Sequence, residues 1–561
     1  MRVEKPTQER GCRIFKALAV LALVVPQWAS ADLFGHRSQR LQDDFGSEIQ
    51  GFAFTNDGFG GALAVGDFNG DGFDDLAISD HESLTDQHEG AVHVLYSDGT
   101  GITGNDELFK DFDPASGLTD RELEDLFGAA LAAGDFNGDG FDDLAIGIPS
   151  EDIGAAANAG MVMVIYGSPA GLFPAGNPGA WRWRLGANGI SGSATLDDLF
   201  GSALTAGDFD NDGKDDLAIG CALCNVSSAG NAGLVLVLYG TTAGLAAADH
   251  RIFTQDSSGA DGTMLDTSES GDQFGSSLAA GDFNQDLAVD LAVGVPGEDL
   301  GATADAGAVQ VVYGFTNVGL RLTGNQFWNE GNVDAGGAVE LSDKWGQALA
   351  AGDVTGEGVD DLVVGTPGED TLGLQDAGAI TLLWGQPGTG LGTPGSETYD
   401  QSDLFDGEAP GAFDGFGHAL AIGDFVDANG IGALDLAVGI PQEGVEDPQT
   451  AFNWVAAGAV TIIPGGFGLV PTSAQLWAQG FGGSAGAAEL NVGQYYGFAL
   501  AVGDFDGTGH ADLAIGAVGV NGITVPGSTG VDAGVVYSLY GALFADGFES
   551  GERSAWSASV P

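Results

Sequence analysis

A short acidic loop with oxygen-bearing side chains at alternate positions is the segment of this sequence best suited to chemistry. Alternate residues of a tight turn can converge on one point, and Gly70 and Gly72 permit the sharp bend. Ca²⁺ is a hard cation that takes about six to eight oxygen ligands, so the loop predicts a calcium site. Its ligands would be the side chains of Asp67, Asn69, Asp71 and Asp75 and the backbone carbonyl of Phe73.

The end of the loop distinguishes it from an EF-hand. An EF-hand needs a bidentate acid at the twelfth loop position, where this loop has Ile78 inside an apolar run. We therefore expect a β-hairpin loop in which Asp75 replaces the late acid. The alternative is that such loops are ordinary acidic β-turns that bind no metal.

Six further copies of the loop carry ligand sets of different quality. Loops two and three keep a full set, and loop four lacks the turn glycine. Loop five carries the hydroxyl of Thr355 and the longer acid Glu357, loop seven replaces one acid by Thr508, and loop six has a three-residue insertion. We expect several Ca²⁺ ions, with the best sites in repeats one to three. The predicted ligands are Asp135, Asn137, Asp139, Phe141 and Asp143 in loop two; Asp208, Asp210, Asp212, Lys214 and Asp216 in loop three; Asp282, Asn284, Asp286, Ala288 and Asp290 in loop four; Asp353, Thr355, Glu357 and Asp361 in loop five; and Asp504, Asp506, Thr508, His510 and Asp512 in loop seven.

Each loop belongs to a longer phrase that occurs seven times, at steps of 68 to 80 residues. Two short apolar runs flank the loop, and a third apolar run and an aromatic-rich fourth run follow it. Near-continuous apolar runs suit strands that are buried on both faces. Four strands per repeat, seven times over, predict an all-β fold, the seven-bladed β-propeller. The repeats begin at Phe59, Phe127, Phe200, Phe274, Trp345, Phe416 and Tyr496.

The two ends of the repeat array predict how the ring closes. The segment Arg40–Phe45 looks like a fourth strand that precedes the first repeat. After the seventh third strand, Val535–Tyr540, no good fourth strand remains. We therefore expect the N-terminal strand to complete the last blade, which would remove the open edge of a linear array.

The phrase FG…GD-x-N/D-x-D-G-x-x-D-L resembles the FG-GAP repeat of the N-terminal propeller of integrin α chains, over residues 40–541. The resemblance implies an exported calcium-binding propeller, often engaged in adhesion or carbohydrate contact. It also places the metal loops on one rim. The long acidic loops between second and third strands would then lie on the opposite rim, where we expect an unknown protein or glycan ligand.

Three segments divide the chain. Basic residues, the apolar run Ala17–Pro26 and the small residues up to Ala31 predict a signal peptide over residues 1–31, cleaved near Ala31, and hence a secreted, extracellular protein. A membrane anchor is the alternative, but ten apolar residues are too few to span ~30 Å of hydrocarbon. Residues 32–541 are the propeller, and residues 542–561 are a C-terminal tail of unknown role.

Cleavage would leave two cysteines, Cys221 and Cys224, in the spacing C-x-x-C. In a cytosolic protein this spacing would suggest redox chemistry or half of a zinc site. An exported chain meets an oxidising environment, so we predict a local disulfide between them.

The composition excludes several classes of protein. A formal charge of −64 opposes binding to nucleic-acid phosphates, and 44% apolar residues oppose disorder. No segment after the leader approaches 18 apolar residues, so we expect no transmembrane segment. We expect a monomeric propeller.

No catalytic motif stands out, so we expect an adhesion or ligand-binding module and not an enzyme. The string GGSAG at residues 482–486 lies in a Gly/Ala loop and not in a strand-to-helix elbow. The alternative is a carbohydrate-active enzyme or a lectin-like propeller, in which Trp454 of the sixth long loop would stack on sugar rings. A third possibility is a surface protein whose only ligand is calcium.

Overall fold

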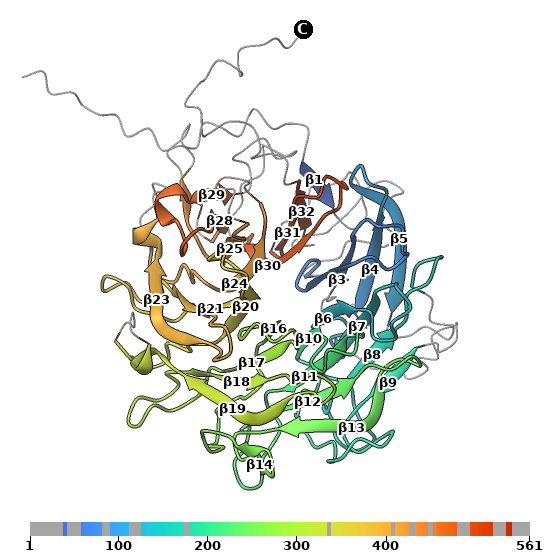
Figure 1. Cartoon of the computed structure of the whole chain (residues 1–561). Helices are drawn as coiled ribbons and strands as arrows, with labels where there is room; N and C mark the ends of the chain where they lie inside the picture. Colours follow the sequence, from blue (N-terminus) through green and yellow to red (C-terminus); the bar gives the residue numbers. More distant parts are fainter. Residues whose placement is uncertain are drawn as a thin grey trace, which may run out of the picture.

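The computed structural model describes residues 38–41, 58–80, 90–110, 125–172, 180–333, 338–404, 410–425, 432–446, 453–454, 456–478, 494–519 and 535–540. Within these residues, the strands form seven four-stranded antiparallel sheets arranged in a ring. The first strands of the blades lie around the centre and the fourth strands lie outside (Figure 1). The fold is the seven-bladed β-propeller that the repeats predict. The predicted signal peptide and the C-terminal tail lie outside the described residues.

The first five blades each consist of four consecutive strands, apart from a small added hairpin of β14 (Ser258–Gly259) and β15 (Gly262–Thr263) after blade three. The strands are β2 (Leu63–Gly66), β3 (Asp75–Asp80), β4 (Ala91–Ser97) and β5 (Ile102–Lys110) in blade one; β6 (Leu131–Gly134), β7 (Asp143–Ile148), β8 (Met161–Ile165) and β9 (Trp181–Trp183) in blade two; β10 (Ala203–Gly207), β11 (Asp216–Cys221), β12 (Leu234–Tyr239) and β13 (Ala246–Phe253) in blade three; β16 (Leu278–Gly281), β17 (Asp290–Val295), β18 (Ala308–Tyr313) and β19 (Arg321–Trp328) in blade four; and β20 (Ala348–Gly352), β21 (Asp361–Thr366), β22 (Ala379–Trp384) and β23 (Gly392–Asp400) in blade five.

The last two blades depart from this simple order. Blade six inserts a hairpin between its second and third strands, and blade seven takes a strand from each end of the chain in the order β1-β32-β31-β30. Their strands are β24 (Ala419–Gly423), β25 (Asp435–Ile440), β28 (Ala459–Ile463) and β29 (Gln475–Ala478), the inserted β26 (Val445–Glu446) and β27 (Asn453–Trp454), and then β30 (Tyr496–Gly503), β31 (Asp512–Ala517), β32 (Val535–Leu539) and β1 (Ser38–Leu41).

The N-terminal strand β1 pairs antiparallel with β32, with Leu41 opposite Val536. The sequence predicts that this strand begins at Arg40, whereas the pairing begins at Ser38. Residues 42–45 of the expected strand lie outside the described residues. Leu41 is buried in one apolar cluster with Phe59 of blade one, so the strand also contributes to the junction between the last and first blades.

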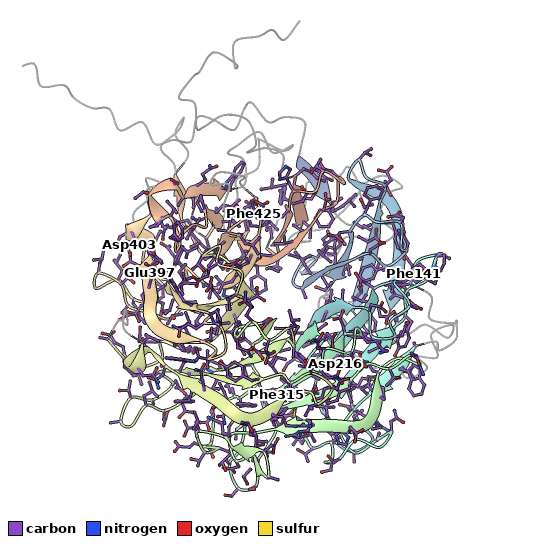
Figure 2. The ribbon with its side chains drawn as sticks, viewed as in Figure 1. Phe141, Asp216, Phe315, Glu397, Asp403 and Phe425 are labelled. Atoms are coloured by element: carbon purple, nitrogen blue, oxygen red, sulfur yellow. A yellow bond between two sulfur atoms is a disulfide. The ribbon has the colours of Figure 1, made fainter. Side chains whose placement is uncertain are left out.

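The described core consists of seven apolar clusters, one at each blade junction. Side chains fill the space between neighbouring sheets (Figure 2). The second strand of every blade is buried along its whole length, because each sheet packs between two others. The strand is therefore apolar throughout and does not alternate with polar residues.

Glycine is required where second strands approach the next blade. A Cβ on Gly147 would lie 2.1 Å from the carbonyl oxygen of Gly201, the glycine of the next repeat's FG pair. Gly201 itself has φ +93°, which other residues rarely adopt. This close approach accounts for glycine both in the FG pair and near the end of the second strand.

Candidate metal centres

The predicted metal loops join the first and second strands of the blades, at an end of the propeller that we call the metal-loop rim. In loop one the backbone winds around a single carboxylate. Asp67 Oδ1 accepts from the N–H groups of Gly70 (2.7 Å) and Asp71 (3.1 Å), and Oδ2 accepts from Gly72 (2.8 Å). Asp135 accepts the three equivalent bonds in loop two. The first predicted ligand thus fixes the conformation of its own loop.

The last predicted ligand of each loop lies buried at its base. Asp75 begins β3 and accepts from the N–H groups of Phe68 (3.2 Å) and Ser97 (2.8 Å), so it joins the loop to the end of β4. Burial, together with the charges of Asp71 and Asp67, raises the pKa of Asp75 to about 8. The same causes act on its counterparts, with pKa values of about 8 for Asp143, Asp216 and Asp290 and about 7 for Asp361.

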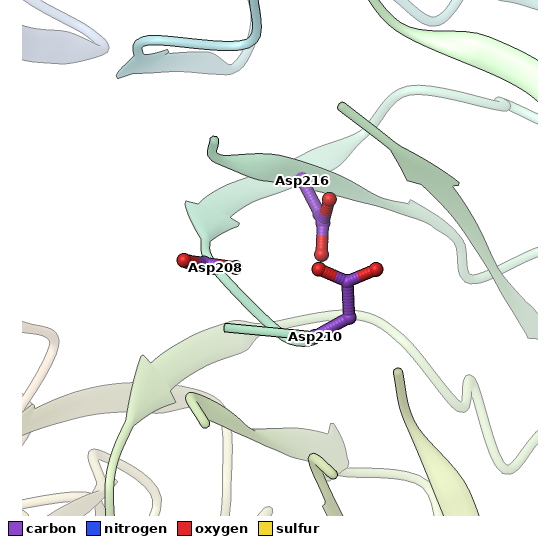
Figure 3. A group of neighbouring side chains, drawn as sticks. All are labelled: Asp208, Asp210 and Asp216. Carbon is purple, nitrogen blue, oxygen red and sulfur yellow. The ribbon is translucent and has the colours of Figure 1, made fainter. Parts of the chain in front are cut away.

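Loop three brings three carboxylates together. The ligand oxygens of Asp208, Asp210 and Asp216 lie within 4.8 Å of one another, and Figure 3 shows the last two side chains facing each other. Asp210 Oδ1 is buried without a hydrogen-bond partner. An oxygen of this kind, among two other carboxylates, fits a cation with hard oxygen ligands. Asp212, a further predicted ligand, pairs instead with Lys214 Nζ at 3.0 Å.

Loop seven forms the second such cluster, from Asp504, Asp506 and Asp512. Asp512 begins β31 and accepts from the N–H of Phe505 (2.9 Å). The sequence predicts a weaker site here than in loops one to three because Thr508 replaces an acid. The N–H of Thr508 donates to both Asp504 and Asp506, so the loop keeps its winding despite the exchange.

Loops one, two and four place an asparagine beside the buried aspartate. The amide nitrogen of Asn69 lies 3.3 Å from Asp75 Oδ2, and Asn137 and Asn284 make the equivalent contacts with Asp143 and Asp290. The predicted ligand is the amide oxygen. Ligation would therefore need a rotation of the amide by 180°, which exchanges its oxygen and nitrogen.

Loop four keeps the winding of loop one without the turn glycine. Leu287 replaces that glycine with φ +75° and stays exposed, and its N–H donates to Asp282 Oδ2 (2.9 Å). In loop five, Glu357 and Gly358 donate in the same way to Asp353. Loop three makes the same bonds, from Asp212 and Gly213 to Asp208. Six described loops, one to five and seven, therefore share this winding, although their ligand sets differ.

The residues predicted to offer a backbone carbonyl share one further contact. In four loops the N–H of this residue donates to the carboxylate two positions earlier: Phe73 to Asp71, Phe141 to Asp139, Lys214 to Asp212 and Ala288 to Asp286. His510 holds the equivalent position in loop seven. These bonds fix the backbone N–H of the residue that is predicted to offer its carbonyl to the metal.

Family models match this chain as "FG-GAP repeat" over residues 59–95, 127–165, 200–238, 274–312 and 345–383. These segments run from the FG pair through the metal loop to the third strand of blades one to five. The chain is an FG-GAP repeat protein. Blades six and seven have the same four-stranded arrangement.

The FG-GAP repeats of this chain are similar to those of two kinds of curated protein. Integrin alpha-PS2 of Drosophila melanogaster is 30% identical over 256 residues, which cover 44% of this chain and 15% of the relative. Phosphatidylinositol-glycan-specific phospholipase D of Rattus norvegicus is 34% identical over 165 residues, which cover 28% of this chain and 18% of the relative. The matches thus span less than a fifth of either relative.

Among solved structures, the Dos1 propeller covers 90% of this chain at 10% identity, with a TM-score of 0.36. The curated relatives include a named enzyme, so membership of the FG-GAP family does not decide between a binding module and an enzyme. No helix within the described part of the chain is long and apolar enough to cross a membrane.

Two sets of residues that link FG-GAP blades were not identified from the sequence. The first is the aspartate before the buried ligand: Asp142 Oδ2 accepts from the N–H of Asp67 in the preceding blade (2.9 Å). The second is the tyrosine that ends a third strand: Tyr166 Oη accepts from the N–H of Leu245 in the next blade (3.0 Å). The Asp-Asp doublet and the terminal tyrosine are visible in the sequence, but their partners are about 75 to 80 residues away.

A disulfide joins Cys221 and Cys224, whose Cα atoms lie 5.4 Å apart. Cys221 is the last residue of β11, and both cysteines are buried at the junction of blades two and three. The bond closes the first turn of the loop between second and third strands, which lies on the opposite rim.

The opposite rim gathers carboxylates at blade junctions in a different way. Between blades four and five, Glu330, Asp343 and Glu369 bring their oxygens within 4.8 Å of one another. Glu330 and Asp343 are only 4% and 1% exposed. Burial is the main cause that raises the pKa of Asp343 to about 6, and burial with the charges of Glu330 and Asp343 raises that of Glu369 to about 8.

The two neighbouring junctions carry a glutamine at the position of Glu330. The equivalent residues are Gln255, Glu330 and Gln401. Each lies two residues after the fourth-strand residue that pairs with the second residue of the third strand. Gln255 Nε2 donates to Glu298 (2.7 Å), and Gln401 Nε2 donates to Glu443 (2.6 Å). Since a carboxyl group donates only when protonated, Glu330 can replace these amides only as the neutral acid.

Proposed function

We propose that this chain is an exported FG-GAP propeller that binds several Ca²⁺ ions and acts as an adhesion or ligand-binding module. The observation that carries the calcium part is the cluster of Asp208, Asp210 and Asp216, with its buried and unpartnered Asp210 Oδ1. A cation would neutralise carboxylates that burial otherwise drives toward the protonated form.

The bound ions would stabilise the propeller. Each loop lies between two strands of one blade and contacts the following blade, so an ion would hold three segments together. If a loop binds with a dissociation constant about a tenth of the ambient concentration, each ion contributes about 1.4 kcal/mol. Four such ions would contribute roughly 5–6 kcal/mol, which is comparable to the net stability of a domain.

We place the unknown protein or glycan ligand on the opposite rim. The long loops between second and third strands lie there, together with the connections from fourth to first strands. Exposed apolar side chains in these segments support a contact surface, among them Leu341, Leu372 and Phe413. The similarity to an integrin α chain supports adhesion as the kind of function.

Secretion belongs to the same proposal. The leader over residues 1–31 and its cleavage near Ala31 rest on the sequence alone. Sequencing the N-terminus of the protein recovered from the culture medium would test both. We retain the expectation that the chain is not an enzyme, because its carboxylates are explained by metal loops and by buried junction contacts.

Thermal unfolding of the purified protein in millimolar calcium and in chelator tests the calcium function. We expect a higher melting temperature with calcium, and equilibrium dialysis should count several ions per chain. The variant Asp210→Asn should bind one ion fewer. Asp249→Asn is the matched control, because Asp249 is exposed on β13, away from the loops. Identical unfolding with and without calcium would refute the calcium proposal.

A further inference from the structure

Each metal loop receives a backbone bond from the following blade. The N–H of Asp142 donates to the carbonyl of Asp67 (3.0 Å). Val289, Leu434 and Ala511 make the same bond to the first loop residues of blades three, five and six. Because this bond forms whatever the side chain is, it belongs to the propeller fold itself.

In four junctions a side chain adds a second bond to the same residue. Asp142 Oδ2 accepts from the N–H of Asp67 (2.9 Å), so the backbone of the first predicted calcium ligand is held through both its N–H and its carbonyl group. The four pairs, each with the aspartate of the following blade first, are Asp142 with Asp67, Asp215 with Asp135, Asp360 with Asp282, and Asp74 with Asp504.

The repeat leaves room for this side chain. The glycine before the first ligand faces the carboxylate, and a Cβ on Gly66 would lie 2.9 Å from Asp142 Oδ2. Gly134 faces Asp215 in the same way, at 2.8 Å. In loop three the equivalent Gly207 faces Val289, which offers no acceptor. The presence of the carboxylate therefore varies between junctions, while the space for it is constant.

We infer that Asp74, Asp142, Asp215 and Asp360 are positioning residues that set the calcium affinity of the loop in the preceding blade. The inference rests on the proposed calcium function. Asp67 is the residue around whose carboxylate loop one winds, so a bond that fixes its backbone also fixes the ligand. Groups that orient a metal ligand from outside typically change affinity by about 10- to 100-fold.

The test compares calcium titrations of the full-length protein and Asp142→Val by calorimetry and equilibrium dialysis. Valine is the residue that blade four carries at this position. We expect one site to weaken by about tenfold while the others keep their affinity. Asp142→Asn retains an acceptor oxygen without the charge, so its calcium affinity at this site should lie between those of the unchanged protein and Asp142→Val. The control Asp249→Asn should titrate as the unchanged protein.

A double variant shows whether Asp142 acts through Asp67. Asp67→Ala should abolish the site in loop one, and adding Asp142→Val should then weaken calcium binding no further. The converse variant, Val289→Asp, should strengthen the site in loop three by about tenfold. This gain keeps the inference testable even if Asp142→Val does not fold.

The outcomes separate this inference from the proposed function. If the unchanged protein binds calcium but Asp142→Val titrates identically, or Val289→Asp gains nothing, the positioning role is wrong while the calcium function stands. If the unchanged protein binds no calcium, the proposed function is wrong, and the inference that rests on it is wrong too.

Discussion

The two rims of the propeller both collect carboxylates at blade junctions, but they surround them differently. On the metal-loop rim, backbone N–H groups bond to the carboxylates, as around Asp67, and the loops stay partly open to solvent. On the opposite rim, acids such as Glu330 and Asp343 are buried against one another. Glutamine amides take part in two of these junctions.

The difference shows two physical solutions to the same excess of negative charge. N–H donors favour the charged form of a carboxylate and hold it in the place where a cation could be bound. Burial beside other acids favours the neutral form. The metal-loop rim also holds buried aspartates with a raised pKa, such as Asp75, and a bound cation would keep these in the charged form. With calcium bound, the pH dependence of stability should therefore come from the opposite rim, and four experiments test this contrast.

Removal of calcium should have the largest effect, and it should act on the metal-loop rim alone. We expect a chelator to lower the stability by roughly 5 kcal/mol, seen as a melting temperature lower by roughly 10 °C. Hydrogen exchange should locate the loss of protection in loops such as 67–75. Equal loss on both rims would contradict the contrast.

Replacement of a buried base aspartate should have the next largest effect. Asp216→Ala leaves the N–H groups of Phe209 and Gly240 without their acceptor, at a cost of about 2–4 kcal/mol. Urea unfolding in chelator measures this cost without the ion. Asp212→Asn is the control in the same loop, with an expected change below about 0.5 kcal/mol. A similar loss of unfolding free energy in both variants would show that burial of the aspartate at the base of the loop does not determine its contribution to stability.

Exchange of Glu330 for glutamine should change how the contribution of this cluster on the opposite rim to the stability of the protein depends on pH. The pKa of Glu369 is raised to about 8, so the folded cluster holds a proton that the unfolded chain releases. Its contribution to stability is present below about pH 4.5 and is lost as the pH rises through about 8. The charged neighbours Asp343, Glu340 and Asp370 act in the same direction.

Glu330→Gln supplies a donor that does not titrate. We expect this variant to be about 1–2 kcal/mol more stable than the unchanged protein at pH 8 and similar to it at pH 4.5. Urea unfolding across this range, in saturating calcium, measures the difference. The reverse exchange, Gln401→Glu, should introduce the same pH dependence between blades five and six. Parallel pH profiles for all three proteins would argue against a shared proton.

The smallest effect should come from Tyr166→Phe, which removes a neutral contact beside the metal-loop rim. The N–H of Leu245 loses its acceptor, at a cost of about 1 kcal/mol. This loss should be the same with and without calcium, because the bond does not involve a metal ligand. A loss that appears only with calcium would mean that the tyrosine belongs to the metal site.

Much of the fold could be predicted from local patterns. The second strands were found because residues such as Leu144 and Ile146 belong to a continuous apolar run, which depends on residue type alone. The alternating oxygens of Asp208, Asp210 and Asp216 likewise predict one cluster, which the structure confirms. The ranking of the loops by calcium affinity stays a prediction, and loop seven gathers three carboxylates although Thr508 replaces an acid.

The sequence by itself determined the repeat, its four strands and the loop that each repeat presents, since these follow from side chains a few residues apart. Only the tertiary structure decided which blade supplies the partner of each residue. Asp142 meets Asp67 across 75 positions, and Tyr540 meets Ile102 across 438. Such contacts exist because the ring brings successive repeats, and the first and last, face to face, and no local pattern encodes that distance.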